Sequence, residues 1–176
     1  PPYQQVVSQK DSSNGQKVSV SIFHHFQMVS DKLGRYTSLI YPAARWIHRS
    51  GKGMEKFGMN QMNDPHLSLL KFYPISTDIF KDVGIADGLS IVMKDCLKTS
   101  SGFRYVYSKN GVETSILANC PDSELFVLNP QDRGIVSCLE SAINNYGCLH
   151  KAILSRCLFS IESDFVEKNP SFVRQY

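Results

Sequence analysis

The chain has 176 residues, of which 42% are hydrophobic and 20% charged, and its formal net charge is +3 at pH 7. This composition excludes a disordered chain and fits one globular domain, with room for the start of a second. The mild positive charge permits contact with a polyanion without requiring it. The sequence has neither a run of about 18 apolar residues nor a signal-peptide pattern, so we expect no membrane segment and a cytoplasmic protein.

The beginning of the chain is expected to form a loop, a helix and a strand. Residues 4–17 are polar and turn-rich, which predicts an exposed loop. Apolar residues recur every three or four positions over Val18–Leu33, which predicts an amphipathic helix ending at Gly34. A β-prone run follows over Tyr36–Tyr41. Helix, glycine turn and buried strand in this order favour a βαβ-type unit and a parallel sheet.

The middle of the chain continues this alternation and then changes to a hairpin. An Asn-Gly turn between alternating strands, here Asn110-Gly111, is the strongest local signal for a hairpin. A hairpin after parallel strands makes a mixed sheet. The expected elements are a helix over Met54–Met62, strands over Leu67–Tyr73 and Gly88–Lys94 with a loop over 74–87 between them, and a hairpin over Phe103–Leu117.

The pattern changes after Pro130, where we expect a domain boundary that separates residues 1–130 from residues 131–176. A helix ending at Gly147 is predicted, and the run Leu149–Ile153 is a candidate start for another. The first helix is predicted from four apolar residues at helical spacing: Ile135, Leu139, Ile143 and Tyr146.

The cysteines predict no disulfide framework and no zinc site, because their number is odd and no two of them form a C-x-x-C pair. We expect reduced thiols that are buried as small hydrophobic side chains. No metal is therefore predicted. The five cysteines are Cys96, Cys120, Cys138, Cys148 and Cys157.

Five short motifs follow one another along the first half of the chain. They are Pro1-Pro2-Tyr3, Phe26, Ile40-Tyr41-Pro42-Ala43-Ala44-Arg45-Trp46, Gly51-Lys52-Gly53 and Phe80-Lys81-Asp82-Val83-Gly84-Ile85-Ala86-Asp87-Gly88. In order and spacing they resemble the γ-type N6-adenine-specific DNA methyltransferases of type II restriction-modification systems. In that family one strand ends in Asn-Pro-Pro-Tyr, and a later strand ends in an Ile-Pro-Ala-Arg-Trp-like motif. The resemblance covers residues 1 to about 120.

The resemblance implies the C-terminal half of a Rossmann-like methyltransferase domain that uses S-adenosylmethionine. Residues 1–130 would form a mixed sheet ending in an antiparallel hairpin, and residues 131–176 would begin a DNA target-recognition domain. The implied partners are double-stranded DNA and a missing N-terminal half of the same protein. We expect the chain alone to be inactive, because that half would complete the sheet and hold most of the cofactor.

The sequence departs from the family pattern at three places. No Asn or Asp precedes Pro1, because the chain begins there. The Pro-Ala-Arg-Trp motif contains an additional alanine, and Lys81 stands where the family has a proline after the motif phenylalanine. The first departure puts activity of the chain alone in doubt, whereas the other two leave the resemblance intact.

The resemblance assigns catalytic roles to Pro1, Pro2 and Tyr3. The carbonyl of Pro1, with the family's asparagine, would accept hydrogen bonds from the exocyclic amine of adenine, and proline suits this role because it has no N–H. The target base leaves the duplex before it reacts. Tyr3 and Phe80 would then stack on the flipped base. The alternative for Phe80 is a loop aromatic that fills the core.

The resemblance also places the adenine ring of S-adenosylmethionine against Phe26 and Pro2, whereas periodicity favours core packing for Phe26. A glycine-rich first loop for the cofactor is absent from the sequence. Gly51-Lys52-Gly53 suits a loop near phosphate or a plain surface turn. Arg45 and Trp46 lie just past a strand end, and a surface ion pair and a lid over the core remain open for them. Four cations of the last segment are candidates for phosphate contact: Lys151, Arg156, Lys168 and Arg174.

Two other functions remain open from the sequence. One is a methyltransferase with the same Pro-Pro-Tyr chemistry that acts on an RNA base or a protein glutamine. The other is a non-catalytic DNA-binding module that keeps the fold without the chemistry. The long segment after residue 130 favours a DNA target.

Overall fold

The computed structural model describes residues 4–8, 17–49, 54–119 and 126–147 of the chain. Two compact units are present, Pro1–Asp132 and Arg133–Tyr176. The first unit has mixed α/β structure and contains every strand that the structure describes. The described part of the second unit is the helix α4 (Arg133–Tyr146).

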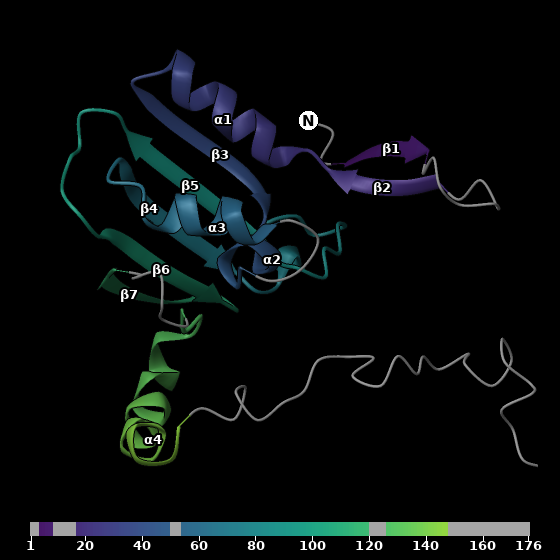
Figure 1. Ribbon diagram of the computed structural model, residues 1–176. Coiled ribbons are helices and arrows are strands. Elements are labelled where there is room, and N and C mark those ends of the chain that lie inside the picture. Colours follow the sequence, from purple (N-terminus) through teal and green to yellow (C-terminus); the bar gives the residue numbers. More distant parts are fainter. Residues whose placement is uncertain (1–3, 9–16, 50–53, 120–125, 148–176) are drawn as a thin grey trace, which may run out of the picture. The chain divides into compact units, whose positions relative to one another are not determined.

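A five-stranded mixed sheet is the framework of the first unit (Figure 1). The strand order is β3-β5-β4-β6-β7. β5 is antiparallel to both neighbours, β4 and β6 are parallel, and β6 and β7 form an antiparallel hairpin. The strands are β3 (Tyr36–Pro42), β4 (Leu67–Tyr73), β5 (Leu89–Asp95), β6 (Phe103–Lys109) and β7 (Val112–Ala118).

The mixed sheet and its terminal hairpin are confirmed, but the predicted parallel sheet is wrong for most of its pairs. β3 and β4 run in the same direction and are joined through helices, as in a βαβ unit. They are not neighbours, because β5 turns back after the loop that follows β4 and inserts between them. Local periodicity cannot reveal such an insertion, since β3 pairs with β5, a strand that is distant in the sequence.

The N-terminal segment forms a hairpin where a loop and the start of a helix were predicted. β1 (Gln4–Ser8) and β2 (Lys17–Ser21) pair as an antiparallel hairpin in which Gln4 is opposite Ser21. Val18 and Val20 alternate with serines, which suits a strand better than a helix. The helix therefore begins five residues later than predicted, as α1 (Phe23–Leu33).

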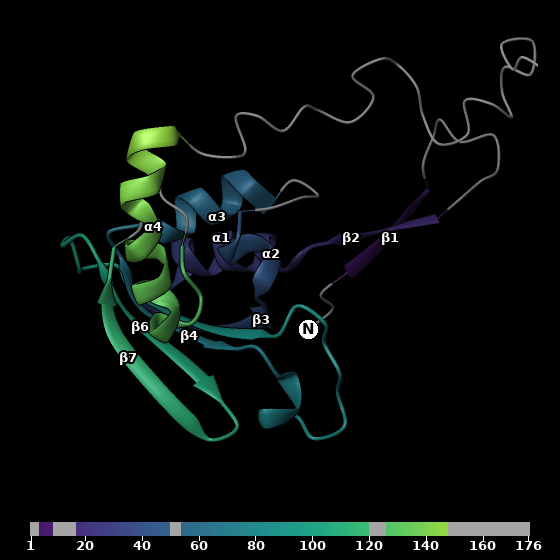
Figure 2. The same cartoon turned by 90° about the horizontal axis from the view of Figure 1, so that it is seen from below.

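Three helices lie on the same face of the sheet (Figures 1 and 2). They are α1, α2 (Ala44–Ile47) and α3 (Met54–Met62). Trp46 of α2 is completely buried, and its indole N–H donates to the Ser90 hydroxyl at 3.4 Å. The strands contribute alternate side chains to the same core, among them Tyr41, Leu70, Val92 and Tyr105.

Helix α1 buries a different face from the one that its apolar periodicity predicted. Phe23 and Gln27 are buried, because Phe23 stacks on Tyr41 and Gln27 accepts a hydrogen bond from the Tyr41 hydroxyl. Phe26 is 43% exposed, so core packing of Phe26 is wrong. Val29 and Leu33 are also exposed. The apolar stripe of α1 thus faces away from this sheet.

Most of the remaining predicted elements are confirmed. The helix over Met54–Met62 is α3, and the hairpin turn has positive φ angles at Asn110 (52°) and Gly111 (77°), as a tight Asn-Gly turn requires. Two short 3₁₀ segments, η1 (Ser76–Asp78) and η2 (Pro130–Asp132), lie in loops. Helix α4 ends before Gly147, which has a φ of 79° and donates its N–H to the Ile143 carbonyl. The run Leu149–Ile153 lies outside the described residues.

The expectation of buried cysteines is wrong at the two positions that the structure describes. Cys96 and Cys138 are free thiols with exposed side chains. Cys96 follows the end of β5, and its N–H donates to the Arg35 carbonyl. Cys120, Cys148 and Cys157 lie outside the described residues.

Candidate functional site

A pocket of about 570 Å³ opens at the end of the sheet where β3 stops. The register places this end at Pro42, which is opposite Leu89 of β5, while Leu89 also pairs with Tyr73 of β4. Ligands of open α/β sheets usually bind beyond the carboxyl ends of the strands. The lining residues are Ser21, Phe23, Pro42, Arg45, Met54, Gly84, Ile85, Ala86 and Asp87.

The loop between β4 and β5 forms one wall of this pocket and is held by its own hydrogen bonds. The buried Ser76 hydroxyl donates to the Val83 carbonyl at 2.7 Å and accepts the Ile85 N–H at 2.8 Å. The Phe80 N–H donates to the Ser76 carbonyl at 3.0 Å. The loop therefore presents Phe80 and the lining residues 84–87 as one folded segment.

Gly88 allows this loop to approach the end of β4. Its φ is +63°, and a Cβ at this position would overlap the Tyr73 carbonyl oxygen. Glycine adopts this backbone conformation without the steric penalty that other residues meet. The Ala44 N–H donates to the Asp87 carbonyl at 2.8 Å, so the loop is also tied to the start of α2.

The charged groups among the lining residues form one ion pair. Arg45 Nε lies 2.9 Å from Asp87 Oδ2, with the two side chains 45% and 30% exposed. Of the alternatives left open for Arg45 and Trp46, the structure shows a surface ion pair for Arg45 and a core position for Trp46. Apolar groups complete the lining and come from Phe23, Pro42, Met54 and Ile85.

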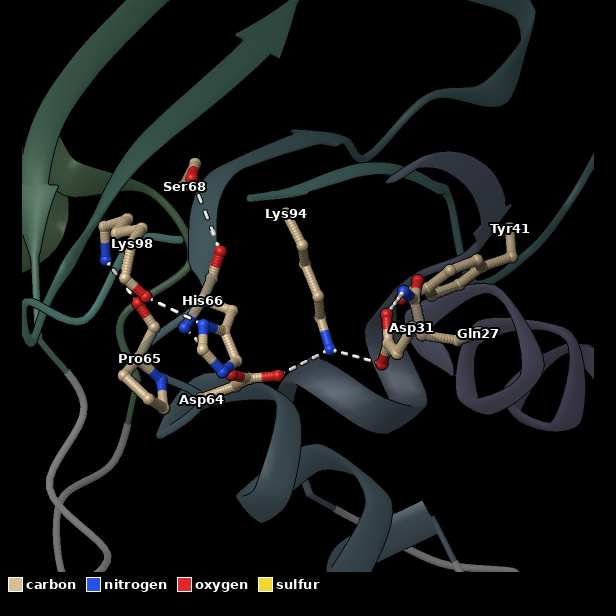
Figure 3. Close-up of polar contacts among 9 residues, drawn as sticks. All are labelled: Gln27, Asp31, Tyr41, Asp64, Pro65, His66, Ser68, Lys94 and Lys98. Carbon is tan, nitrogen blue, oxygen red and sulfur yellow. Dashed lines mark hydrogen bonds and ion pairs between the residues drawn. The ribbon is translucent and has the colours of Figure 1, made fainter. Parts of the chain in front are cut away.

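A second polar cluster lies at the opposite end of the sheet, where Lys94 of β5 pairs with Thr37 and Leu67 (Figure 3). The Lys94 side chain is 4% exposed, and its ammonium donates to Asp31 at 2.8 Å and to Asp64 at 2.7 Å. Asp64 also accepts the His66 N–H at 2.9 Å. One buried cation thus has two carboxylate partners.

The same cluster extends towards the pocket through α1. The Gln27 amide donates to Asp31 at 2.6 Å, and the Gln27 carbonyl oxygen accepts from the Tyr41 hydroxyl at 3.2 Å. Burial, and secondarily the negative charge of Asp31, raises the pKa of Tyr41 well above its ordinary value. Tyr41 therefore stays a neutral donor.

Of the predicted site residues, the structure describes Phe80 and Phe26. Phe80 is 40% exposed, so it does not fill the core, and it lies in the loop that lines the pocket without lining the pocket itself. Phe26 lies on the exposed side of α1, one helical turn after the pocket residue Phe23. Neither is in the pocket wall.

Pro1, Pro2 and Tyr3 lie outside the described residues, as do Gly51-Lys52-Gly53 and the four C-terminal cations. Gln4, the residue that follows Tyr3, is opposite Ser21, which lines the pocket. Two pocket features were missed from the sequence, the wall residue Phe23 and the pairing of Arg45 with Asp87. The motifs containing Arg45 and Asp87 were visible separately, but nothing local indicated that they meet.

No group of three or more His, Cys, Asp or Glu side chains in the described part of the chain is arranged to hold a metal ion. Among the helices that the structure describes, none has the length and apolar character needed to cross a membrane.

Comparisons with models of protein families, with curated proteins and with solved structures find no match for this chain.

Proposed function

We propose that this chain is part of a site-specific DNA adenine N6-methyltransferase of a cytoplasmic restriction-modification system, and that its pocket receives the flipped adenine. S-adenosylmethionine supplies the methyl group in this reaction. The family resemblance is the origin of the proposal. The observation that carries it is that two separate motifs meet at one pocket, whose lining also includes Ser21, the strand partner of Gln4.

The convergence involves segments that are far apart in the sequence. Pro42 and Arg45 belong to the motif that ends β3, and Asp87 belongs to the motif that precedes β5, yet all three line the pocket. The Arg45–Asp87 pair and the hydrogen bond from Ala44 to Asp87 join the two motifs directly. The third motif, Pro1-Pro2-Tyr3, immediately precedes Gln4, which pairs with the pocket residue Ser21.

The proposed chemistry uses these groups in different ways. The carbonyl of Pro1 accepts a hydrogen bond from the amine that receives the methyl group, and Tyr3 stacks on the base. Phe80 provides a second aromatic face from the loop that forms one wall of the pocket, where its exposed ring lies outside the lining described above. Each base–aromatic stack contributes about 1–3 kcal/mol, which offsets the few kcal/mol that flipping costs.

A further part of the protein belongs to this proposal. β3 is an edge strand of the described sheet, and apolar side chains are exposed along it and along the neighbouring helix α1. Tyr36 and Ile40 point to the opposite face of β3 from Tyr41, which packs on α1, so the exposed residues of β3 and of α1 form two separate apolar areas. Exposed apolar surface of this kind usually marks an interface. It suits the strands and helices of the other half of a methyltransferase domain. The exposed residues are Phe26, Val29, Leu33, Tyr36 and Ile40.

The cofactor fits this arrangement only in part. The exposed ring of Phe26 suits a planar partner such as the adenine of S-adenosylmethionine, and Pro2 would lie in the same contact. The chain has no G-x-G-x-x-G loop for the rest of the cofactor. The remaining contacts are therefore assigned to the other half of the domain, and DNA contacts to residues after 130.

The test is methyl transfer from labelled S-adenosylmethionine to unmethylated plasmid DNA, with the chain joined to the segment that precedes it in its gene. We expect label in N6-methyladenine, reduced by about tenfold to a hundredfold in Phe80→Ala and in Tyr3→Ala, because each change removes one stacking face. Val83→Ala is the matched control, since Val83 is an exposed apolar residue of the same loop.

The other outcomes separate the alternatives. Label in RNA or in protein glutamine instead of DNA would replace the substrate and keep the chemistry. No label with DNA still bound would favour the non-catalytic module. Equal losses in Phe80→Ala and Val83→Ala would contradict the stacking role of Phe80.

A further inference from the structure

The Arg45–Asp87 pair belongs to the lining of the pocket that is proposed to receive the base. Arg45 carries the one cation among the lining residues that the structure describes, and Phe23 and Met54 contribute apolar groups to the same lining. A nucleotide has the same two parts, a planar apolar base and an anionic phosphate. The pocket of about 570 Å³ is large enough for a nucleotide.

The ion pair uses one of several donors of the guanidinium group. Arginine has five N–H donors, and the contact with Asp87 is made through Nε. The Nη donors form the planar fork that matches two oxygens of a phosphate. The Asp87 carboxylate lies against Nε and so fixes the orientation of the guanidinium group.

The exposure of the pair makes an exchange of partners feasible. Arg45 is 45% exposed and Asp87 30% exposed, so neither group must leave a buried position to meet a ligand. The main-chain bond from Ala44 to Asp87 holds the two motifs together even if the side chains separate. A phosphate can therefore bind without unfolding the pocket wall.

We propose that Arg45 binds the phosphate of the nucleotide whose base enters the pocket, and that Asp87 positions Arg45 for this contact. The inference rests on the proposed function and adds the group that recognises the backbone next to the flipped adenine. It assigns Arg45 to substrate positioning and leaves the methyl transfer itself to the Pro-Pro-Tyr motif.

The experiment measures binding of 2′-deoxyadenosine and of its 5′-monophosphate to the 176-residue protein by calorimetry. The monophosphate should bind about tenfold more tightly than the nucleoside, the usual size of one charge-assisted phosphate contact. This difference should vanish in Arg45→Gln, persist in part in Arg45→Lys and increase severalfold in Asp87→Asn, which keeps an acceptor for Nε and removes a negative charge.

Arg35→Gln is the matched control for general charge effects. Arg35 forms a similar ion pair with Asp95, with side chains 55% and 28% exposed, at the other end of the sheet. The Arg35→Gln change should leave the affinities for 2′-deoxyadenosine and for its 5′-monophosphate unchanged. An equal loss in Arg35→Gln and Arg45→Gln would overturn the inference.

A second arm identifies the source of the phosphate. Dinucleotides containing deoxyadenosine are compared with a native phosphodiester and with a neutral methylphosphonate linkage. An Arg45-dependent preference for the native linkage supports a contact with the DNA backbone. A preference confined to the monophosphate supports the phosphate contact and assigns it to a free nucleotide.

The outcomes separate this inference from the proposed function. Binding of deoxyadenosine with no gain from the phosphate would overturn the role of Arg45 and keep the adenine pocket. Arg45-dependent binding of the monophosphate without binding of the nucleoside would keep the phosphate contact and contradict the adenine site. No binding of any probe would overturn both.

Discussion

The two ends of the sheet carry the same kinds of charged groups in opposite settings. At one end Arg45 and Asp87 form a single half-exposed pair beside a pocket. At the other end Lys94 is buried and is bonded to the two carboxylates of Asp31 and Asp64 (Figure 3). The first pair can exchange a partner for a ligand, whereas the second cannot lose a partner without leaving a charge uncompensated.

The difference is one of desolvation. A buried ion pair forms only when good geometry and further hydrogen bonds repay the removal of charges from water. Asp31 and Asp64 have such further bonds, from the Gln27 amide and the His66 N–H. An exposed pair contributes about 0–1 kcal/mol and is easily rearranged. We therefore assign stability to the Lys94 end and ligand binding to the Arg45 end.

The largest effect is expected from Lys94→Ala. The change leaves two carboxylates facing each other without their cation, and we expect the free energy of unfolding to fall by about 3 kcal/mol, the lower part of the range for a broken buried pair because both carboxylates are partly exposed. Urea denaturation measures it. The matched control is Lys71→Ala, because Lys71 also lies on a central strand but pairs with the one exposed carboxylate of Glu113. Similar losses of unfolding free energy in Lys94→Ala and Lys71→Ala would contradict the claim that the buried Lys94 pair contributes more to stability than an exposed pair.

A smaller effect is expected from Tyr41→Phe. The change removes the donor to the Gln27 carbonyl oxygen and leaves that acceptor buried, which costs about 1–2 kcal/mol. Thermal unfolding at neutral pH measures the difference. An unchanged stability would show that Gln27 finds another donor and that α1 does not depend on this bond.

The pH dependence of stability provides a related prediction. Burial raises the pKa of Tyr41 well above 10.0 and also raises the pKa of Tyr105. Each hydroxyl thus stays protonated in the folded state while it ionises in the unfolded chain. Stability is full below pH 10 and falls as pH rises above it, by up to about 1.4 kcal/mol per pH unit for each tyrosine. Tyr41→Phe should make this alkaline fall shallower in urea titrations between pH 9 and pH 11, and an unchanged slope would contradict the assignment.

The smallest effect on stability is expected from Arg45→Gln. The pair with Asp87 is half exposed, so its loss should change the free energy of unfolding by no more than about 0.5 kcal/mol. Denaturation of Arg45→Gln beside Lys94→Ala tests the contrast directly. A loss at Arg45 as large as that at Lys94 would make the pocket pair a structural element.

Local sequence patterns predicted the positions of helices and strands better than they predicted which strands are neighbours in the sheet. The strands over Leu67–Tyr73 and Phe103–Leu117 were predictable because alternation and an Asn-Gly turn are local signals. The insertion of β5 between β3 and β4 was not, because strand order depends on long-range pairing. The hairpin of β1 and β2 was missed because polar residues concealed a short alternating run.

Burial was also only partly predictable. Periodicity identified an apolar stripe on α1, but the structure buries Gln27 against Tyr41 and exposes Phe26. A buried lysine such as Lys94 has no sequence signal, since its burial depends on carboxylates from two other elements. Neither Phe26 nor Phe80 lines the pocket, and the meeting of Arg45 with Asp87, two residues of separate motifs, required the fold.

The most direct test of the difference between the two ends of the sheet, ligand binding at Arg45 and stability at Lys94, is a chemical-shift map. The ¹⁵N-labelled chain is titrated with 2′-deoxyadenosine. We predict that the amide signals of Phe23, Ala86 and Asp87 shift in a saturable manner, while those of His66 and Lys94 stay in place. Shifts centred on His66 and Lys94, or no shift at any of these amides, would contradict the assignment of ligand binding to the pocket end of the sheet.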